Sequence, residues 1–136
     1  MFGIGFGGGL MFGRAMAGGD SPAGENGRVP DPGPIVPVGE FTSNLAGSGR
    51  HVISFSVSLE AVNIRAAEVV SSPGWHVRIR NEILLVVKDK KFEDLTSAEG
   101  ALQLAEEIRR SLNSQLPSVR GEVPVVRVLF DSFVVQ

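Results

Sequence analysis

The stretch RHVISFSVSLE, residues 50–60, decides the fold of this chain. Its apolar and serine side chains alternate, with Phe55, Val57 and Leu59 on one side and Ser54, Ser56 and Ser58 on the other. A period of two is typical of a strand with one face in the core and one in water. A second strand is predicted at residues 40–45, and the turn at 47–49 joins the two into a hairpin.

The clearest helix signal lies further along the chain. Residues 96–99, TSAE, have the capping-box form, in which a hydroxyl accepts from the third amide and a carboxylate reaches back. Apolar residues at helical spacing follow, and Pro117 ends the helix. Glu106 is spaced to pair with Arg110 on its outer face. A helix that starts at Thr96 is therefore predicted.

Three other segments complete the predicted fold. Residues 61–72 have helical spacing and end at Pro73 and Gly74, which are expected to break the chain. Residues 77–87 fit either a strand or a helix, and their charged and polar start favours the helix. Residues 125–136 are apolar on both faces, which is typical of a strand in the middle of a sheet. The sequence predicts an α+β domain, with an antiparallel or mixed sheet of three or more strands and two or three helices on one side.

The charge and composition exclude some classes of partner and site. The net charge is −2, and the only basic tract is KDKK at residues 88–91, so we expect no nucleic-acid partner. The chain contains no cysteine, which excludes disulfides and thiolate metal sites. GIGFGG, residues 3–8, spells the dinucleotide pattern G-x-G-x-x-G, but it lacks the preceding strand and following helix that a pyrophosphate site needs.

The titratable residues indicate no reaction. His51 and His76 are the only histidines, and neither has a second histidine or a carboxylate at metal-ligand spacing. Asp131 interrupts an apolar strand, which is expected of a charge at a strand kink or a sheet edge. A hydrolase that uses Asp131 with a histidine would need both groups within hydrogen-bond reach. We predict no catalytic, cofactor-binding or metal-binding residue, and no enzyme activity.

The N-terminal segment predicts a membrane anchor. Residues 1–13, MFGIGFGGGLMFG, carry no charge and have glycines four residues apart at Gly5, Gly9 and Gly13. Such spacing permits close helix packing in lipid, and this glycine content is tolerated in a membrane helix. Thirteen residues span about 20 Å as a helix, less than the ~30 Å hydrocarbon core. We therefore interpret them as the outer end of a single transmembrane helix.

A linker separates this anchor from the predicted domain. Residues 14–34 are rich in proline and glycine, which favours an extended tether, and the α+β domain is predicted at residues 35–136. Two alternatives remain for the N-terminus. One is a signal peptide cleaved after the A-x-A-like residues 15–17, although no basic region precedes the apolar run. The other is a soluble tail.

Four segments, in order along the chain, carry a family resemblance. They are PIVPVGEFTSNL at residues 34–45, IRNEILL at 79–85, LTSAEG at 95–100 and FDSFVVQ at 130–136. Together they resemble the flagellar basal body-associated protein FliL over residues 34–136. The resemblance implies a non-enzymatic, single-pass protein of the bacterial inner membrane, with its C-terminal domain in the periplasm and a stomatin/SPFH-like fold.

The resemblance also implies partners. Members of the family form homo-oligomeric rings around or beside the flagellar stator units MotA and MotB, and they support torque and swimming or swarming motility. It implies no cofactor. A segment that joins tether to domain should lie near the membrane-proximal ring, so we predict an oligomer or partner interface at Gly39, Glu40, Phe41, Asn44 and Leu45. The alternative is a membrane-tethered periplasmic binding or scaffold module of SPFH type, unrelated to the stator.

Overall fold

The computed structural model describes residues 31–47 and 49–136. Residues 33–136 form one compact unit. Its elements, in chain order, are β2 (Ile35–Asn44), β3 (Val52–Ala61), α1 (Ile64–Ser71), α2 (Pro73–Lys88), η1 (Phe92–Leu95), α3 (Ala98–Gln115) and β4 (Val125–Val135). The predicted anchor at residues 1–13, with Gly5, Gly9 and Gly13, and the linker as far as residue 30 lie outside the described residues. Among the helices that are described, none is both long and apolar enough to cross a membrane.

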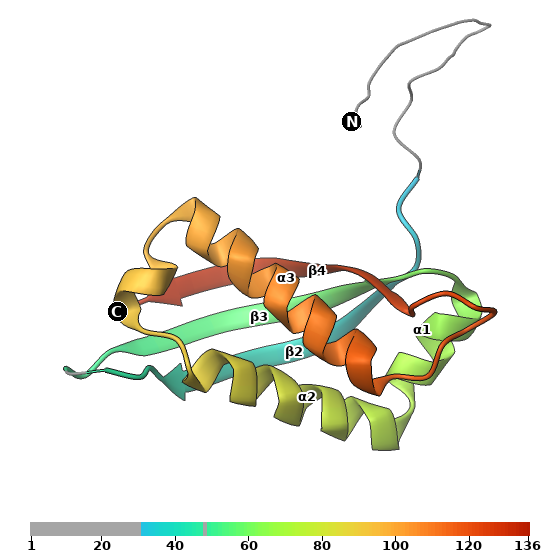
Figure 1. The fold of residues 1–136 in the computed structure, drawn as a ribbon, viewed down its shortest axis with the longest axis horizontal. Helices are drawn as coiled ribbons and strands as arrows, with labels where there is room; N and C mark the ends of the chain where they lie inside the picture. The colour runs from blue at the N-terminus through green and yellow to red at the C-terminus, as the bar shows by residue number, and fades with distance from the viewer. Residues whose placement is uncertain (1–30, 48) are drawn as a thin grey trace, which may run out of the picture. The chain divides into compact units, whose positions relative to one another are not determined.

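The sheet is antiparallel with the strand order β2-β3-β4 (Figure 1). The predicted hairpin is confirmed, because Phe41 of β2 lies opposite Phe55 of β3. The prediction that the C-terminal strand lies in the middle was wrong: β3 is the central strand, and β4 forms an edge. Apolar residues of β4 on the face away from the helices, such as Val134, remain exposed instead of being buried by a second layer.

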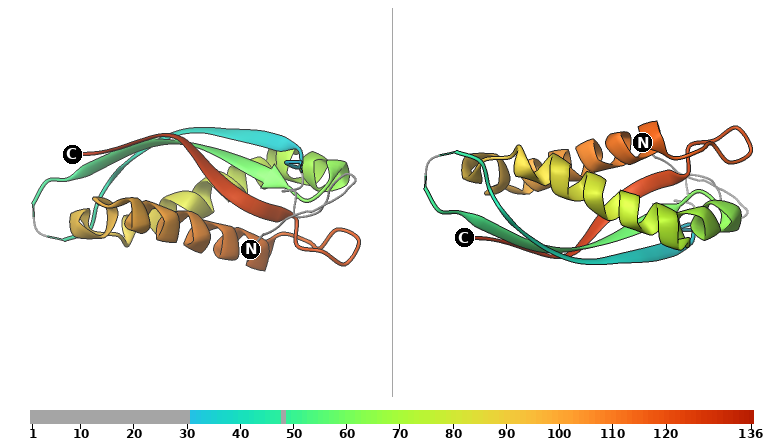
Figure 2. Two further views of the ribbon diagram at one scale, coloured as in Figure 1. Left: turned by 90° about the horizontal axis from the view of Figure 1, so that it is seen from above. Right: turned by 90° about the horizontal axis from the view of Figure 1, so that it is seen from below.

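Two long helices cover one face of the sheet (Figure 2). The core between them and the sheet contains Phe41, Phe55, Ile79, Ile83, Leu104, Ile108 and Leu112, all buried. The preference for a helix at residues 77–87 is confirmed by α2, which contributes Ile79, Ile83 and Val87 to this core. The break predicted at Pro73 separates two helices: α1 ends at Ser71, Ser72 is extended, and Pro73 begins α2, because proline at the first helical position lacks only an N–H that has no intrahelical acceptor.

The start of α3 differs by one residue from the predicted one. Ser97 is the N-cap, and its side-chain oxygen accepts from the N–H of Gly100 at 3.0 Å. Thr96 is instead the C-cap of η1 and donates its hydroxyl to the carbonyl of Glu93 at 3.4 Å. The predicted pair of Glu106 and Arg110 is present at 3.6 Å.

The sheet face opposite the helices is only partly as predicted. Ser54 is exposed and Ser56 half-buried, but Ser58 is buried and donates to Asp131 at 3.1 Å. Asp131 is exposed and is the extra residue where the β3–β4 register shifts between Ser56 and Val57. The interpretation of Asp131 as a charge at a kink and an edge is therefore confirmed.

Candidate interaction surface

The five residues of the predicted interface divide between the two faces of β2. Phe41 and Leu45 point to the helix side, where they are 3 % and 8 % exposed, and Phe41 stacks on Phe55 with ring centroids 5.1 Å apart. Glu40 and Asn44 lie on the opposite face and are exposed. The buried pair stabilises the fold, so only Glu40 and Asn44 offer side chains to a partner.

Gly39 belongs to a β-bulge in β2. The β2–β3 register shifts between Pro37 and Gly39, and Gly39 has φ +123°, a conformation that favours glycine. A Cβ at Gly39 would lie 2.9 Å from Nη1 of Arg80. The bulge therefore makes room for a side chain from α2.

Arg80 clamps the outer edge of β2 at this bulge. Its Nη1 donates to the carbonyl of Val38 at 3.1 Å, and its Nη2 to the carbonyl of Glu40 at 3.0 Å. Its guanidinium also lies 4.2 Å from the centroid of the Phe41 ring. Arg80 is not among the residues predicted from the sequence to form an interface. Its position beside Ile79 on the border of an apolar stripe was the available signal, but its acceptors lie about forty residues away.

A second polar cluster fixes the start of β2. Glu60 is only 7 % exposed, although it lies on the sheet face away from the helices. Its carboxylate accepts from the backbone N–H of Gly33 at 3.1 Å and pairs with Arg127 Nη1 at 3.0 Å. Pro34 accepts from the N–H of Ala61 at 2.8 Å. The chain therefore enters the domain beside the C-terminal end of β3, where Glu60 lies.

The face of the sheet away from the helices presents a polar surface. Its exposed or half-buried side chains include Glu40, Thr42, Asn44, Ser54, Ser56, Ser132 and Val134. Hydroxyls pair across the strands, with Thr42 and Ser54 3.5 Å apart and Ser56 and Ser132 3.4 Å apart. We call these seven residues the free sheet face. Only one of these seven residues, Glu40, is charged, and their hydroxyl and amide groups can form hydrogen bonds with another protein surface.

A tight joint connects η1 to α3. The backbone of Gly100 lies so close to η1 that a Cβ there would be 2.0 Å from the carbonyl oxygen of Asp94. Asp94 in turn accepts from the N–H of Lys91 at 2.9 Å. Glycine at position 100 is thus required by close backbone approach, which gives the LTSAEG segment a structural explanation.

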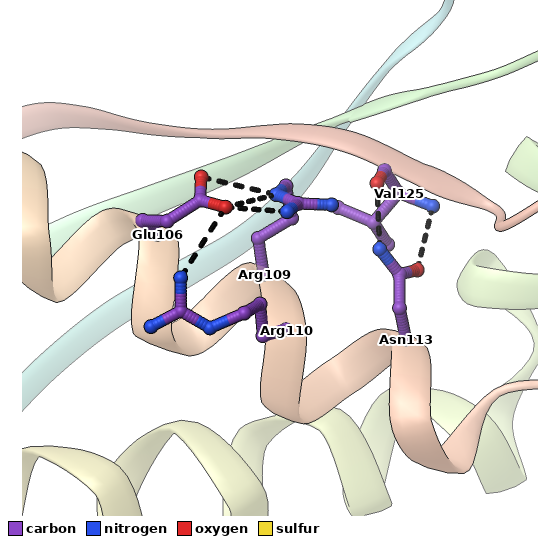
Figure 3. A network of polar contacts seen from close by, with 5 residues as sticks. All are labelled: Glu106, Arg109, Arg110, Asn113 and Val125. Carbon is purple, nitrogen blue, oxygen red and sulfur yellow. Dashed lines mark hydrogen bonds and ion pairs between the residues drawn. The ribbon is translucent and has the colours of Figure 1, made fainter.

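The side chains of α3 reach the first residue of β4 (Figure 3). Asn113 donates its amide to the carbonyl of Val125 at 2.8 Å and accepts from the N–H of Val125 at 3.0 Å. Nearby, Arg109 donates to both oxygens of Glu106. These hydrogen bonds, with smaller coulombic contributions, lower the pKa of Glu106 and raise that of Arg109.

The titratable residues that sequence analysis weighed have separate partners. His51 stacks on Phe92 with centroids 4.0 Å apart, and its Nδ1 lies 3.0 Å from the carbonyl oxygen of Gln136. Asp131 accepts from Ser58, and His76 lies in the first turn of α2. Within residues 31–47 and 49–136, no group of three or more candidate ligands could hold a metal ion. Among the described residues, no hydrogen bond joins Asp131 to His51 or His76, as the hydrolase alternative would require.

A pocket of about 220 Å³ lies beside His51. Its other lining residues are Ala46, Gly47, Lys91, Phe92 and Glu93. Gly47, Lys91 and Glu93 are exposed, so this pocket opens on the surface. It differs from the buried, mixed-polarity cavity that the binding-module alternative would require.

Each of the four segments behind the family resemblance contains residues that connect one element of the fold to another. Residues 34–45 form β2 and its bulge, 79–85 include Arg80, and 95–100 form the joint of η1 and α3. In residues 130–136, Phe130 and Phe133 contact the ring of Phe55, and Gln136 exchanges backbone hydrogen bonds with Val52.

Comparison with known proteins agrees with this assignment. No curated protein matches the chain. The family described as flagellar basal body-associated protein FliL matches residues 35–136, the whole of the described fold from the start of β2. The chain therefore belongs to the FliL family of flagellar basal body-associated proteins.

Proposed function

We propose that this protein is a non-enzymatic structural component of the flagellar basal body, which forms a ring around or beside the stator units MotA and MotB. In this proposal residues 1–13 anchor it in the inner membrane, residues 14–34 are the tether, and residues 35–136 lie in the periplasm as an SPFH-like scaffold. The ring supports torque generation and swimming or swarming. The observation that carries the proposal is the family match over residues 35–136.

The arrangement of the domain is consistent with a scaffold. Its recurrent polar contacts, such as those of Arg80 and Glu60, join one element of the fold to another. The free sheet face is the broad surface that neither long helix covers, and it includes Glu40 and Asn44. We infer that this face contacts a ring neighbour or the stator.

The position of the linker shows which end of the free sheet face lies nearer to the predicted membrane anchor. β2 begins at Ile35, directly after the linker, and Glu60 holds Gly33 at that end of the sheet. A strand rises about 3.3 Å per residue, so Asn44 lies about 30 Å further along β2 than Ile35. Glu40 is therefore nearer to the tethered end than Asn44, and it is the better candidate for a membrane-proximal contact.

The decisive experiment joins co-purification to motility. Deletion of the gene should reduce swimming under high viscous load, and the full chain should co-purify with MotA and MotB. Glu40→Lys should weaken co-purification, whereas Glu68→Lys, which reverses another exposed carboxylate, on α1, should not. Normal motility at high load after deletion, together with the absence of stator subunits from the purified chain, would overturn the proposal.

A further inference from the structure

The two edges of the sheet differ in their protection against strand addition. On β2, Pro37 lacks an N–H, Gly39 forms a bulge, and Arg80 occupies the carbonyls of Val38 and Glu40. Proline, bulges and covering side chains are the devices by which proteins protect an edge strand. β4 contains no proline, and no described strand pairs with its outer edge; its own bulges, at Asp131 and Val126, lie at the two ends of residues 127–130 and leave that stretch regular. The outer edge of β4 is therefore the one open to a further strand.

The hydrogen-bond pattern shows which groups of β4 point outward. At one end of the ladder, Val52 and Gln136 exchange both backbone bonds, and at the other Val62 donates to Pro124 at 2.9 Å. Because the bonds of an antiparallel ladder alternate, intervening residues direct their N–H and C=O to the outer edge. They are Val125, Val128, Phe130, Phe133 and Val135. Asn113 occupies both groups of Val125, so the open stretch begins after it.

We propose that the outer edge of β4 is a self-association surface, at which a second copy of the chain adds its own β4 antiparallel about a two-fold axis at Leu129. In this register Val128 and Phe130 of each copy exchange backbone hydrogen bonds with Phe130 and Val128 of the other. The register therefore uses outward-pointing groups on both sides. It ends at the Asp131 bulge and at the Val125 cap formed by Asn113.

The charges of β4 favour the same register. An axis at Leu129 places Arg127 of one copy opposite Asp131 of the other, twice by symmetry, with the two Leu129 side chains between them. The Arg127 side chain is 62 % exposed even though it pairs with Glu60, and Asp131 is also exposed. Opposite charges across neighbouring strands stabilise a sheet, and like charges destabilise it. The strand is thus self-complementary, as a two-fold interface requires.

Helix α3 supplies an apolar contribution beside this edge. Glu106, Arg109 and Asn113 point from α3 toward β4 in Figure 3, and Leu102 belongs to the same stripe by helical spacing. Leu102 is 71 % exposed. A two-fold axis at Leu129 brings a second α3 alongside the first, on the same side of the extended sheet, and covers this leucine.

The pairing goes beyond the proposed ring, because an isologous contact joins two copies and does not close a ring by itself. It leaves the free sheet face uncovered, since β4 of the second copy extends the sheet sideways. Glu40 and Asn44 remain available to the stator or to a ring neighbour. Stator binding and β4 pairing can therefore fail independently.

Disulfide cross-linking of the full chain tests the pairing, because the native sequence has no cysteine. Directly opposed residues at a non-hydrogen-bonded position have Cα atoms about 4.5 Å apart, within disulfide range. In mild detergent under oxidation, Leu129→Cys should form a covalent dimer about tenfold faster than Thr42→Cys, because pairing raises the local thiol concentration. Thr42 is an exposed residue of the same face on β2. Equal rates for the two variants, fast or slow, would overturn the proposal.

Second substitutions in the Leu129→Cys chain separate pairing from chance collision. Asp131→Lys should return the rate to that of Thr42→Cys, because it places two cations opposite one another. Leu102→Ser should also slow cross-linking, whereas Leu85→Ser, at an exposed leucine of α2, should leave the rate unchanged. Unchanged cross-linking with Asp131→Lys would refute the register. Co-purification of MotA and MotB with the Leu129→Lys chain is measured in parallel. Because stator binding and β4 pairing can fail independently, this chain should still bind the stator subunits, and the test of pairing stays separate from the test of the proposed function.

Discussion

Replacement of Arg80 by methionine tests the clamp between α2 and β2. The change keeps an unbranched side chain of similar length but removes two charged hydrogen bonds, of 3.1 and 3.0 Å, and the contact with the Phe41 ring at 4.2 Å. Hydrogen bonds to a charged group contribute about 1.5–3 kcal/mol each when buried, and less at a half-buried site. A cation–π contact at such a site adds about 0.5–1 kcal/mol. We expect the free energy of unfolding to fall by about 2–4 kcal/mol.

Thermal unfolding of the full chain, followed by circular dichroism, measures this loss. For a unit of this size the expected decrease in Tm is about 8–16 °C. Arg80→Lys keeps the charge but loses the planar fork whose two nitrogens reach the two carbonyls, so it should lose about half as much. Arg78→Met is the matched control, because Arg78 is an exposed arginine of the same helix whose guanidinium lies 4.9 Å from the Trp75 ring. A loss for Arg80→Met no more than about 0.5 kcal/mol greater than for Arg78→Met would refute the reasoning.

Three further predictions concern the joints around α3. Gly100→Ala should destabilise the fold by about 1–3 kcal/mol in urea unfolding, because its Cβ would overlap the Asp94 carbonyl, whereas Gly74→Ala, with open space around it, should be neutral or stabilising. Asn113→Ala should cost about 1–3 kcal/mol and speed amide exchange at the start of β4; unchanged exchange there would count against the cap. The pKa of Glu106 is lowered from 4.5 by Arg109, so its contribution to stability is present above about pH 4.5 and is lost as the pH falls through the folded-state pKa. Urea unfolding at several pH values should therefore show a smaller acid-induced loss for Glu106→Gln than for the native chain, and parallel curves would contradict this.

Local patterns were sufficient to predict the elements but not the order of the strands. The alternation in residues 50–60 predicted β3, and the apolar stripe with its cap predicted α3 within one residue. The position of β4 could not be read in the same way, because an apolar edge strand and an apolar central strand have the same composition. Only the pairing distinguishes them: β4 pairs with β3, whose residues lie 64 to 82 positions earlier in the chain, and with no other described strand.

The polar contacts were harder to predict than the elements for a related reason. Ser58 belongs to a row of serines that reads as solvent-exposed, but the bulge at Asp131 brings a carboxylate over it. Arg80 has no local partner, since its acceptors are carbonyls of β2. Gly39 was the nearest signal, because an isolated glycine within a strand pattern indicates a bulge or a close approach.

The family motifs identify the fold of this chain more directly than they identify its contacts. Phe41 and Leu45 were predicted as interface residues because their segment joins the tether to the domain, yet both are buried. Gly100 is explained by the approach of the Asp94 carbonyl. Since these motif residues make contacts within the domain, only the exposed residues between them can contact a partner. The specificity of assembly should therefore depend on positions such as Glu40 and Leu102, and substitutions there should leave the family's fold intact.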